Sequence, residues 1–171
     1  LFPEFSGASE WKAVGMRILE QESARQVLPD GGGIEQAFGY QLFIIDLLGL
    51  VQALLEHHGE SVPATIANSV RNGRTFLDSF GINQKNLPSI GDYDGGYALS
   101  RHLRISWAGD AVRNGRSITF ADSGYSIFHV CSSSPFRLTF DHGALGMPPC
   151  FAHGHADALS VILSCGDQEI L

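Results

Sequence analysis

The hydrophobic residues change their spacing halfway along this 171-residue chain, and the change limits the folds open to it. Before about residue 88, apolar residues recur at three- and four-residue steps, which is the spacing of one face of an α-helix. After the stretch GDYDGG (91–96) the spacing falls to two, as in a half-buried β-strand. Helices followed by strands predict an α+β fold, with a helical part at 1–97 and an antiparallel β part at 98–171.

Three helices are predicted in the first part, over about 9–26, 34–57 and 62–80. The first carries one apolar face, made of Trp11, Val14, Ile18 and Leu19. The second is apolar on more than one side, which favours a position between other helices. Glycines follow the second and third helices as stop signals, and the short connections predict antiparallel helical hairpins.

Four segments of the second part alternate between apolar and polar residues: 103–107, 117–120, 125–130 and 136–140. A fifth candidate strand is FAHGHADALSV (151–161). Side chains two residues apart share one face of a strand, so His153, His155 and Asp157 would point the same way and could act together. The last five residues also have strand character, and we expect the sequence to be a piece of a longer protein.

Charge and composition argue against two classes of partner. The net charge is −7 and no run is rich in Lys or Arg. This argues against nucleic acid, whose phosphates need clustered cations. The longest apolar run, 42–55, contains Asp46, Gly49 and Gln52, so no transmembrane segment is expected. The sequence carries no signal for an oligomeric state.

The residues alone leave the role of the HGHAD pattern open. Imidazole and carboxylate groups suit zinc, but a zinc site needs a third protein ligand, and local spacing fixes none. A pair of ordinary, hydrogen-bonded histidines explains the pattern more simply. HGHADA also resembles the HxHxDH signature of metallo-β-lactamase-type hydrolases, but Ala158 stands where that signature has a histidine.

Two other places could carry chemistry. Glu35 is expected in the first turn of the second helix, where the helix dipole favours a carboxylate, and Tyr40 lies one turn further on. A phenol beside cationic groups can move a proton, whereas a half-buried helix aromatic needs no such role. The loop around Asp92 and Asp94 lacks the further acidic positions of an EF-hand, so we expect a solvated turn rather than a calcium site.

Several stretches, taken in this order, resemble the heparinase II/III-like polysaccharide lyase family: DGGGIEQAFGY, LPSIGDYDGG, FADSGYSIFHV and DHGALGMPPCFAHGHADALS. The resemblance covers nearly the whole chain. It implies the end of an incomplete α/α toroid, followed by the first strands of an antiparallel β-sandwich domain. It also implies cleavage of an acidic, uronate-containing polysaccharide by β-elimination. Because members mostly act outside the cytoplasm, it implies an extracytoplasmic (periplasmic or secreted) location.

The resemblance also assigns roles to single residues. Tyr40 matches a catalytic tyrosine that acts as base or acid near the scissile bond. His153 matches a catalytic histidine that reaches into the same cleft from the β domain. His155 matches a ligand of a zinc ion beside that cleft, whose remaining ligands are expected beyond Leu171. Asp157 is expected to support the site rather than to bind the metal.

The chain departs from the family pattern at Gln41, where members usually have histidine, and at Ala144, where they usually have proline. The helix that carries the carboxylate-neutralising Asn or His of the family is not among these residues. We therefore expect these 171 residues alone to be inactive and to bind zinc poorly. The departures support an alternative, a non-catalytic carbohydrate-binding or structural member of the same fold. A metal-dependent hydrolase is a further alternative.

Overall fold

The computed structural model describes residues 2–80, 87–98, 100, 117–130, 136–166 and 168–171. Three helices come first: α1 (Ala8–Gln26), α2 (Phe38–His57) and α3 (Ala64–Phe80). Five strands follow: β1 (Ser117–Phe120), β2 (Tyr125–Val130), β3 (Phe136–Asp141), β4 (Val161–Cys165) and β5 (Gln168–Glu169). The predicted α+β class is confirmed, with helices before an antiparallel sheet. The strand predicted at 103–107 lies outside the described residues.

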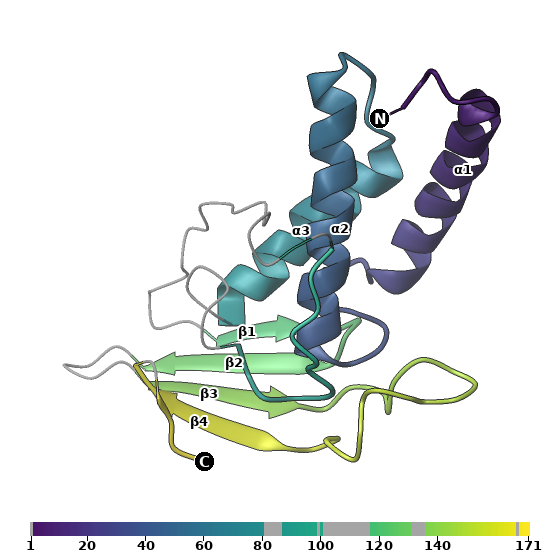
Figure 1. The fold of residues 1–171 in the computed structure, drawn as a ribbon. Helices are drawn as coiled ribbons and strands as arrows, with labels where there is room; N and C mark the ends of the chain where they lie inside the picture. The colour runs from purple at the N-terminus through teal and green to yellow at the C-terminus, as the bar shows by residue number, and fades with distance from the viewer. Residues whose placement is uncertain (1, 81–86, 99, 101–116, 131–135, 167) are drawn as a thin grey trace.

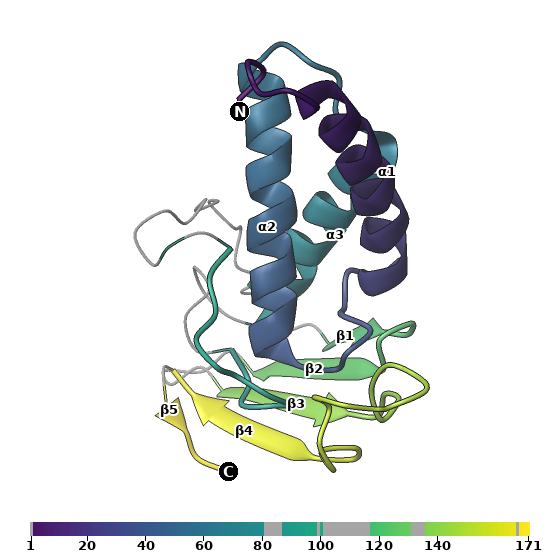
Figure 2. The ribbon, with the colours of Figure 1, turned by 45° about the vertical axis from the view of Figure 1, so that its right-hand side comes forward.

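The helices stand on one face of the sheet and rise away from it (Figure 1). Figure 2 shows the first turn of α2 above β2, and the N-terminal end of the chain far from the strands. The middle of this arrangement is α3, which contacts both α1 and α2. The helical part therefore meets the sheet through helix ends and the loops beside them.

The sheet is a simple meander in which neighbours in the sequence are neighbours in space. Its strand order is β1-β2-β3-β4-β5, and all pairs are antiparallel. The register sets Tyr125 of β2 opposite both Phe120 of β1 and Asp141 of β3. Because side chains alternate between the faces of a strand, Tyr125 and Ile127 point to the same side, where both are buried.

An aromatic core joins the helices to the sheet. It consists of Phe38, Phe76, Phe80, Phe120 and Tyr125, all of which are buried. The ring centroids of Phe38 and Tyr125 are 5.3 Å apart, and those of Phe76 and Phe120 are 4.8 Å apart, both in edge-to-face contact. Such pairs stabilise a fold beyond the burial of their area. The start of α2 is thereby fixed against β2.

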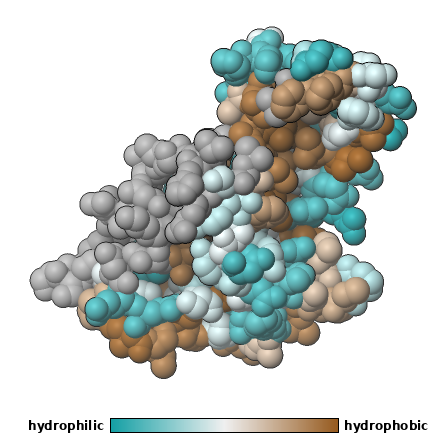
Figure 3. Space-filling model, in the orientation of Figure 1, coloured by the Kyte–Doolittle hydropathy of each residue, from teal (hydrophilic) through white to brown (hydrophobic). Residues whose placement is uncertain are grey.

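The opposite face of the sheet is apolar and exposed. Phe128, Val130, Phe136 and Val161 alternate with inward-facing residues and keep 36% to 58% of their surface exposed. In Figure 3 apolar surface gathers along the lower side of the molecule, below the strands. Two sheets that pack in a β-sandwich cover such faces with each other. The face is therefore suited to the β-sandwich that the sequence predicts.

The second helix begins four residues later than predicted, at Phe38 rather than Ile34. Gln36 has a φ of 56° and Ala37 is extended, so neither continues a helix. The N–H of Phe38 donates to the carbonyl of Ile90 at 3.2 Å, which ties the helix start to another loop. Glu35 consequently lies before the helix, and the prediction that it occupies the first turn was wrong.

Within the described residues, α2 is the helix that is long and apolar enough to cross a membrane by length and composition. In the structure 44% of its most apolar stretch is buried inside the protein. Two polar side chains, Gln41 and Asp46, are also buried on it. Asp46 accepts a hydrogen bond from the N–H of Ala98 at 3.2 Å. Packing in the core thus gives one reason for the apolar composition of α2.

Candidate active site

The two histidines of the HGHAD pattern lie in a loop, not in a strand. We call residues 151–160 the histidine loop; it precedes β4, which begins at Val161. His153 has a φ of 73° and His155 a φ of 50°, values that no regular strand contains. The strand prediction for 151–160 was therefore wrong. Phe151 and Leu159 in the same loop also have positive φ, so the spacing of two residues does not come from an extended strand here.

The structure brings Tyr40 and His153 together although 112 residues separate them in the sequence. Tyr40 is the third residue of α2, and its ring meets the imidazole of His153 edge to face with centroids 4.8 Å apart. Both side chains are only partly buried. A proton donor or acceptor must be reachable by substrate, so partial exposure of this pair suits catalysis.

Asp92, in the loop after α3, contacts both histidines. Its Oδ2 lies 3.0 Å from Nδ1 of His153, and its Oδ1 contacts Nε2 of His155. The N–H of Asp92 also donates to the carbonyl of His153 at 2.9 Å. One residue thus holds both the backbone and the side chain of His153. Tyr93 and Asp94 are exposed, as in the solvated turn that the sequence predicts, but Asp92 is partly buried against the histidine loop.

A further hydrogen bond fixes the same loop to Asp157. The N–H of Gly91 donates to Oδ2 of Asp157 at 2.7 Å. Ile90 bonds to the start of α2, as described above, so Ile90, Gly91 and Asp92 lie between α2 and the histidine loop. We call these three residues the 90–92 strap. It joins the element that carries Tyr40 to the loop that carries His153.

Glycine is needed where the strap passes α2. Gly91 has a φ of 69°, and a Cβ added to it would lie 2.6 Å from Cα of Ala37. A Cβ on Gly39 would lie 2.3 Å from Cδ2 of Tyr93 and 2.9 Å from the carbonyl oxygen of Asp92. No ordinary contact is that short, so larger residues at either position would push the strap away from the helix.

The charges around the pair are mostly negative. Partial burial raises the pKa of Tyr40, and the carboxylates of Asp94, Asp92 and Glu35 raise it further. The hydrogen bond from His153 is the largest cause that lowers the pKa of Asp92. At neutral pH Tyr40 is therefore a neutral phenol, a proton donor, beside an ionised Asp92.

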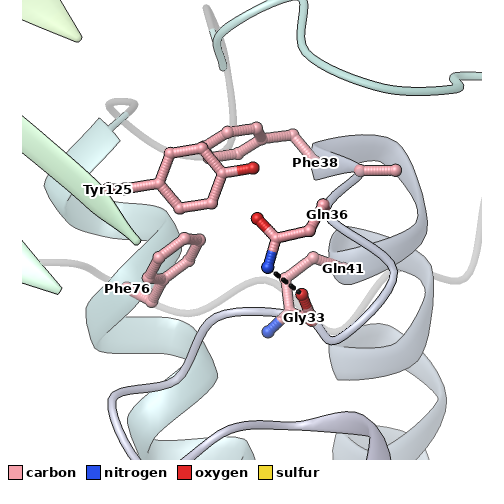
Figure 4. Close-up of a pocket in the computed structure, with 7 residues that line it drawn as sticks. Gly33, Gln36, Phe38, Gln41, Phe76 and Tyr125 are labelled. Carbon is pink, nitrogen blue, oxygen red and sulfur yellow. Dashed lines mark hydrogen bonds between the residues drawn. The ribbon is translucent and has the colours of Figure 1, made fainter. Parts of the chain in front are cut away.

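A small pocket beside the start of α2 is lined by Gly33, Gln36, Ala37, Phe38, Gln41, Phe76 and Tyr125. Figure 4 shows the hydroxyl of Tyr125 pointing toward the side chain of Gln36, whose amide nitrogen donates to the carbonyl of Gly33 at 3.4 Å. Gln41 also faces this pocket and donates to the carbonyl of Gly31. Gln41, at which the chain departs from the family pattern, therefore packs against the glycine-rich loop at 31–33.

Tyr125 differs from Tyr40 in what surrounds it. It is 2% exposed, and burial, together with Asp141 and Asp157, raises the pKa of its hydroxyl far above the ordinary value. A group that substrate cannot reach and that does not ionise is a structural residue. Of these two tyrosines, only Tyr40 is a candidate for chemistry.

His155, which the sequence predicts as a zinc ligand, lies beside one carboxylate, that of Asp92. Within the described residues, no group of three or more His, Cys, Asp or Glu side chains could hold a metal ion. A protein zinc site takes at least three such ligands, and the ion pairs of the described residues give His155 one acidic partner, Asp92. A carboxylate beside a histidine is a usual partner of a metal-bound imidazole, so the pair is compatible with a ligand role for His155.

Comparison with known families shows to which family this chain belongs. The family Heparinase II/III N-terminus matches residues 1–102, and the family Heparinase II/III-like, C-terminal, matches residues 112–171. This chain belongs to the heparinase II/III-like family. A comparison with curated protein sequences gives no match.

Solved structures of similar fold agree with this family. A heparinase III structure superposes with a TM-score of 0.74 at 15% identity, over 98% of this chain and 31% of that one. The heparan sulfate lyase HepC from Pedobacter heparinus superposes with a TM-score of 0.72 at 18% identity, over 98% of this chain and 29% of that one. The chain thus spans about a third of the length of these proteins, and at these identities the likeness shows the fold.

Sequence analysis found part of this site and missed the rest. The structure places Tyr40, His153 and His155 within one cluster, and it places Asp157 against the strap. Asp92 and Gly91 were missed as site residues, although GDYDGG was among the stretches that carry the family resemblance. An acidic residue between glycines in a loop is a weak signal by itself, and only the fold brings it to the histidines.

Proposed function

We propose that the full-length protein to which this chain belongs is a lyase that cleaves an acidic, uronate-containing polysaccharide by β-elimination. The 171 residues alone are proposed to be inactive. One observation carries the proposal: Tyr40 of the helical part and His153 of the β part meet at a ring distance of 4.8 Å. Two proton-transfer groups on two separate elements suit a cleft between them.

The reaction needs one group to take a proton and one to give it. His153 is proposed to accept the proton from C5 of the uronate. The C4–C5 double bond forms as the C4–O bond breaks, and Tyr40 is proposed to protonate the departing oxygen. Burial and nearby carboxylates raise the pKa of Tyr40, which favours this acid role over a base role.

The developing charge on the uronate needs a partner that this cluster does not provide. Asp92, Asp94 and Glu35 are all negative and would repel a polyanion. A C5–H is a weak acid, so the enolate-like state must be stabilised by donors or cations. We propose that residues of the full-length protein outside these 171 supply the donors or cations. The chain alone is therefore expected to be inactive.

The activity is tested on the full-length protein with a panel of uronate polymers, following the absorbance of the new C4–C5 double bond. Tyr40→Phe and His153→Ala are each expected to lower kcat by roughly 100-fold or more. Gln21→Ala, an exposed change on α1, serves as the control. Absence of double-bond formation on every polymer would overturn the proposal. Polymer binding without that product would instead support the non-catalytic alternative.

We also propose His155 as one ligand of a zinc ion, with the other ligands supplied by residues beyond Leu171. The support is the family resemblance and the carboxylate of Asp92 beside the imidazole. Metal content of the purified full-length protein measures this directly. His155→Ala is expected to lose the zinc and His153→Ala to keep it; the reverse result would exchange the two assignments.

We propose an extracytoplasmic location only because members of the family mostly act outside the cytoplasm. Fractionation of cells that express the full-length protein tests it. Recovery in the cytoplasmic fraction, with a periplasmic marker in its proper place, would contradict the proposal.

A further inference from the structure

Asp92 is placed to control which nitrogen of His153 carries the proton. Its Oδ2 lies 3.0 Å from Nδ1 of the imidazole. An aspartate is ionised near neutral pH and is then only an acceptor, so Nδ1 must be the donor. In a neutral imidazole this leaves Nε2 as the proton acceptor. A base that takes a proton through Nε2 needs this tautomer.

The contact is supported by the backbone and does not depend on one flexible side chain. The N–H of Asp92 donates to the carbonyl of His153 at 2.9 Å, so the two residues are joined twice. Next to them, the N–H of Gly91 donates to Asp157 at 2.7 Å. Three links therefore fix the strap to the histidine loop. The carboxylate reaches His153 through Oδ2 and His155 through Oδ1, so the two contacts use different oxygens.

The strap also determines where the imidazole lies relative to Tyr40. Ile90 bonds to the N–H of Phe38 at 3.2 Å, two residues before Tyr40. Gly39 allows the strap to pass α2 at a distance that no side chain would permit. The position of Asp92 is consequently set by the helix that carries Tyr40, and Asp92 in turn sets the position of His153.

We propose that Asp92 is a positioning residue that holds His153 in the Nδ1–H tautomer and leaves its Nε2 as the proton acceptor of an imidazole that lies against Tyr40. The role is analogous to that of a carboxylate that orients a catalytic imidazole without taking its proton. The catalytic importance of this tautomer rests on the proposed lyase function. The contact between Asp92 and His153 itself is independent of any substrate.

The test uses the full-length protein labelled with ¹⁵N-histidine, in which the ring signals of His153 are assigned by their loss in His153→Gln. The native protein is expected to show the Nδ1–H tautomer. In Asp92→Asn the signal is expected to move toward Nε2–H, because the NH2 of an amide can donate to an unprotonated Nδ1, whereas a carboxylate can only accept from Nδ1–H. kcat on the cleaved polymer is expected to fall roughly 10- to 100-fold, with KM within about twofold.

Two further variants separate positioning from folding and from charge. Asp92→Glu keeps the carboxylate and is expected to restore part of the Nδ1–H signal and part of kcat. Asp122→Asn removes the same charge from an exposed turn and is expected to change neither. An unchanged tautomer in Asp92→Asn, or a native protein in the Nε2–H tautomer, overturns the proposal. The NMR result needs no substrate, so it decides the positioning role even where no polymer is cleaved.

Discussion

The aromatic core and the histidine loop meet the same end of α2 but are held in opposite ways. Every ring of the core is at most 8% exposed and contacts other rings. In the histidine loop, by contrast, the side chain of His155 is 59% exposed. Four of the loop's residues, Phe151, His153, His155 and Leu159, adopt positive φ without being glycine. The core depends on burial, and the loop depends on a few hydrogen bonds.

The two regions are neighbours, but the aromatic core mainly stabilises the fold, whereas the histidine loop mainly forms the site. A residue of the core contributes many small contacts, so its loss costs free energy of unfolding. A residue of the loop is strained and exposed, and such conformations persist only where neighbouring structure enforces them. The 90–92 strap is that neighbouring structure. Changes in the core should therefore unfold the protein, whereas changes in the strap should mainly impair the site.

The largest effect is expected in the core. Phe76→Ala removes a side chain that is 2% exposed and contacts four other rings, so it should lower the free energy of unfolding by about 3–5 kcal/mol. Phe76→Leu keeps most of the apolar volume and should cost less than half as much. Chemical denaturation measures both. Equal losses in the two variants would show that packing at this position does not follow volume.

A pair of glycine variants tests the strap. Gly91→Ala combines a positive φ with a contact of 2.6 Å to Ala37, whereas Gly95→Ala has a similar φ of 72° and no close contact with the part of the chain that the structure describes. Both should lose about 1–3 kcal/mol from backbone strain. Only Gly91→Ala should also lower kcat, because it moves the strap away from α2. Comparable turnover in the two variants would contradict a role for the strap in the site.

A smaller effect is expected where the helical part meets the turn between β1 and β2. Oδ2 of Asp30 accepts from the N–H of Ser123 at 2.8 Å and lies 3.1 Å from its hydroxyl. Asp30→Ala should therefore cost about 1–2 kcal/mol of unfolding free energy. Asp122→Ala, one residue from Ser123 and exposed, should change it by less than about 0.5 kcal/mol. A thermal melt that ranks them the other way would refute this assignment.

The smallest effect concerns pH. Burial lowers the pKa of His129, and the nearby Arg137 lowers it further. Below the ordinary histidine value of 6.5, the unfolded chain therefore binds a proton that the folded chain does not. Stability should fall with acidification below about pH 6.5, and less steeply in His129→Gln than in the native protein. Parallel slopes of stability against pH in the two proteins would exclude His129 as the cause.

Sequence analysis succeeded where one local pattern decides the outcome. The strands at 117–120 and 125–130 were predicted with the bounds that the structure has, because alternation of apolar residues reports burial on one face. It failed at 151–160, where a similar alternation occurs in a loop with four residues of positive φ. It also failed at Trp11 and Ile18, predicted as an apolar face of α1, which are 63% and 50% exposed in this structure.

The sequence by itself determined the α+β class, the approximate extents of three helices, and the family, because these depend on neighbours in the chain and on short motifs. It also pointed to Tyr40, His153 and His155 through the resemblance. Only the tertiary structure decided that Tyr40 meets His153 and that Asp92 holds the imidazole. The physical reason is that Tyr40, Asp92 and His153 lie more than fifty residues apart in the sequence, on α2, the strap and the histidine loop. Their geometry is set by the packing of α2 on the sheet.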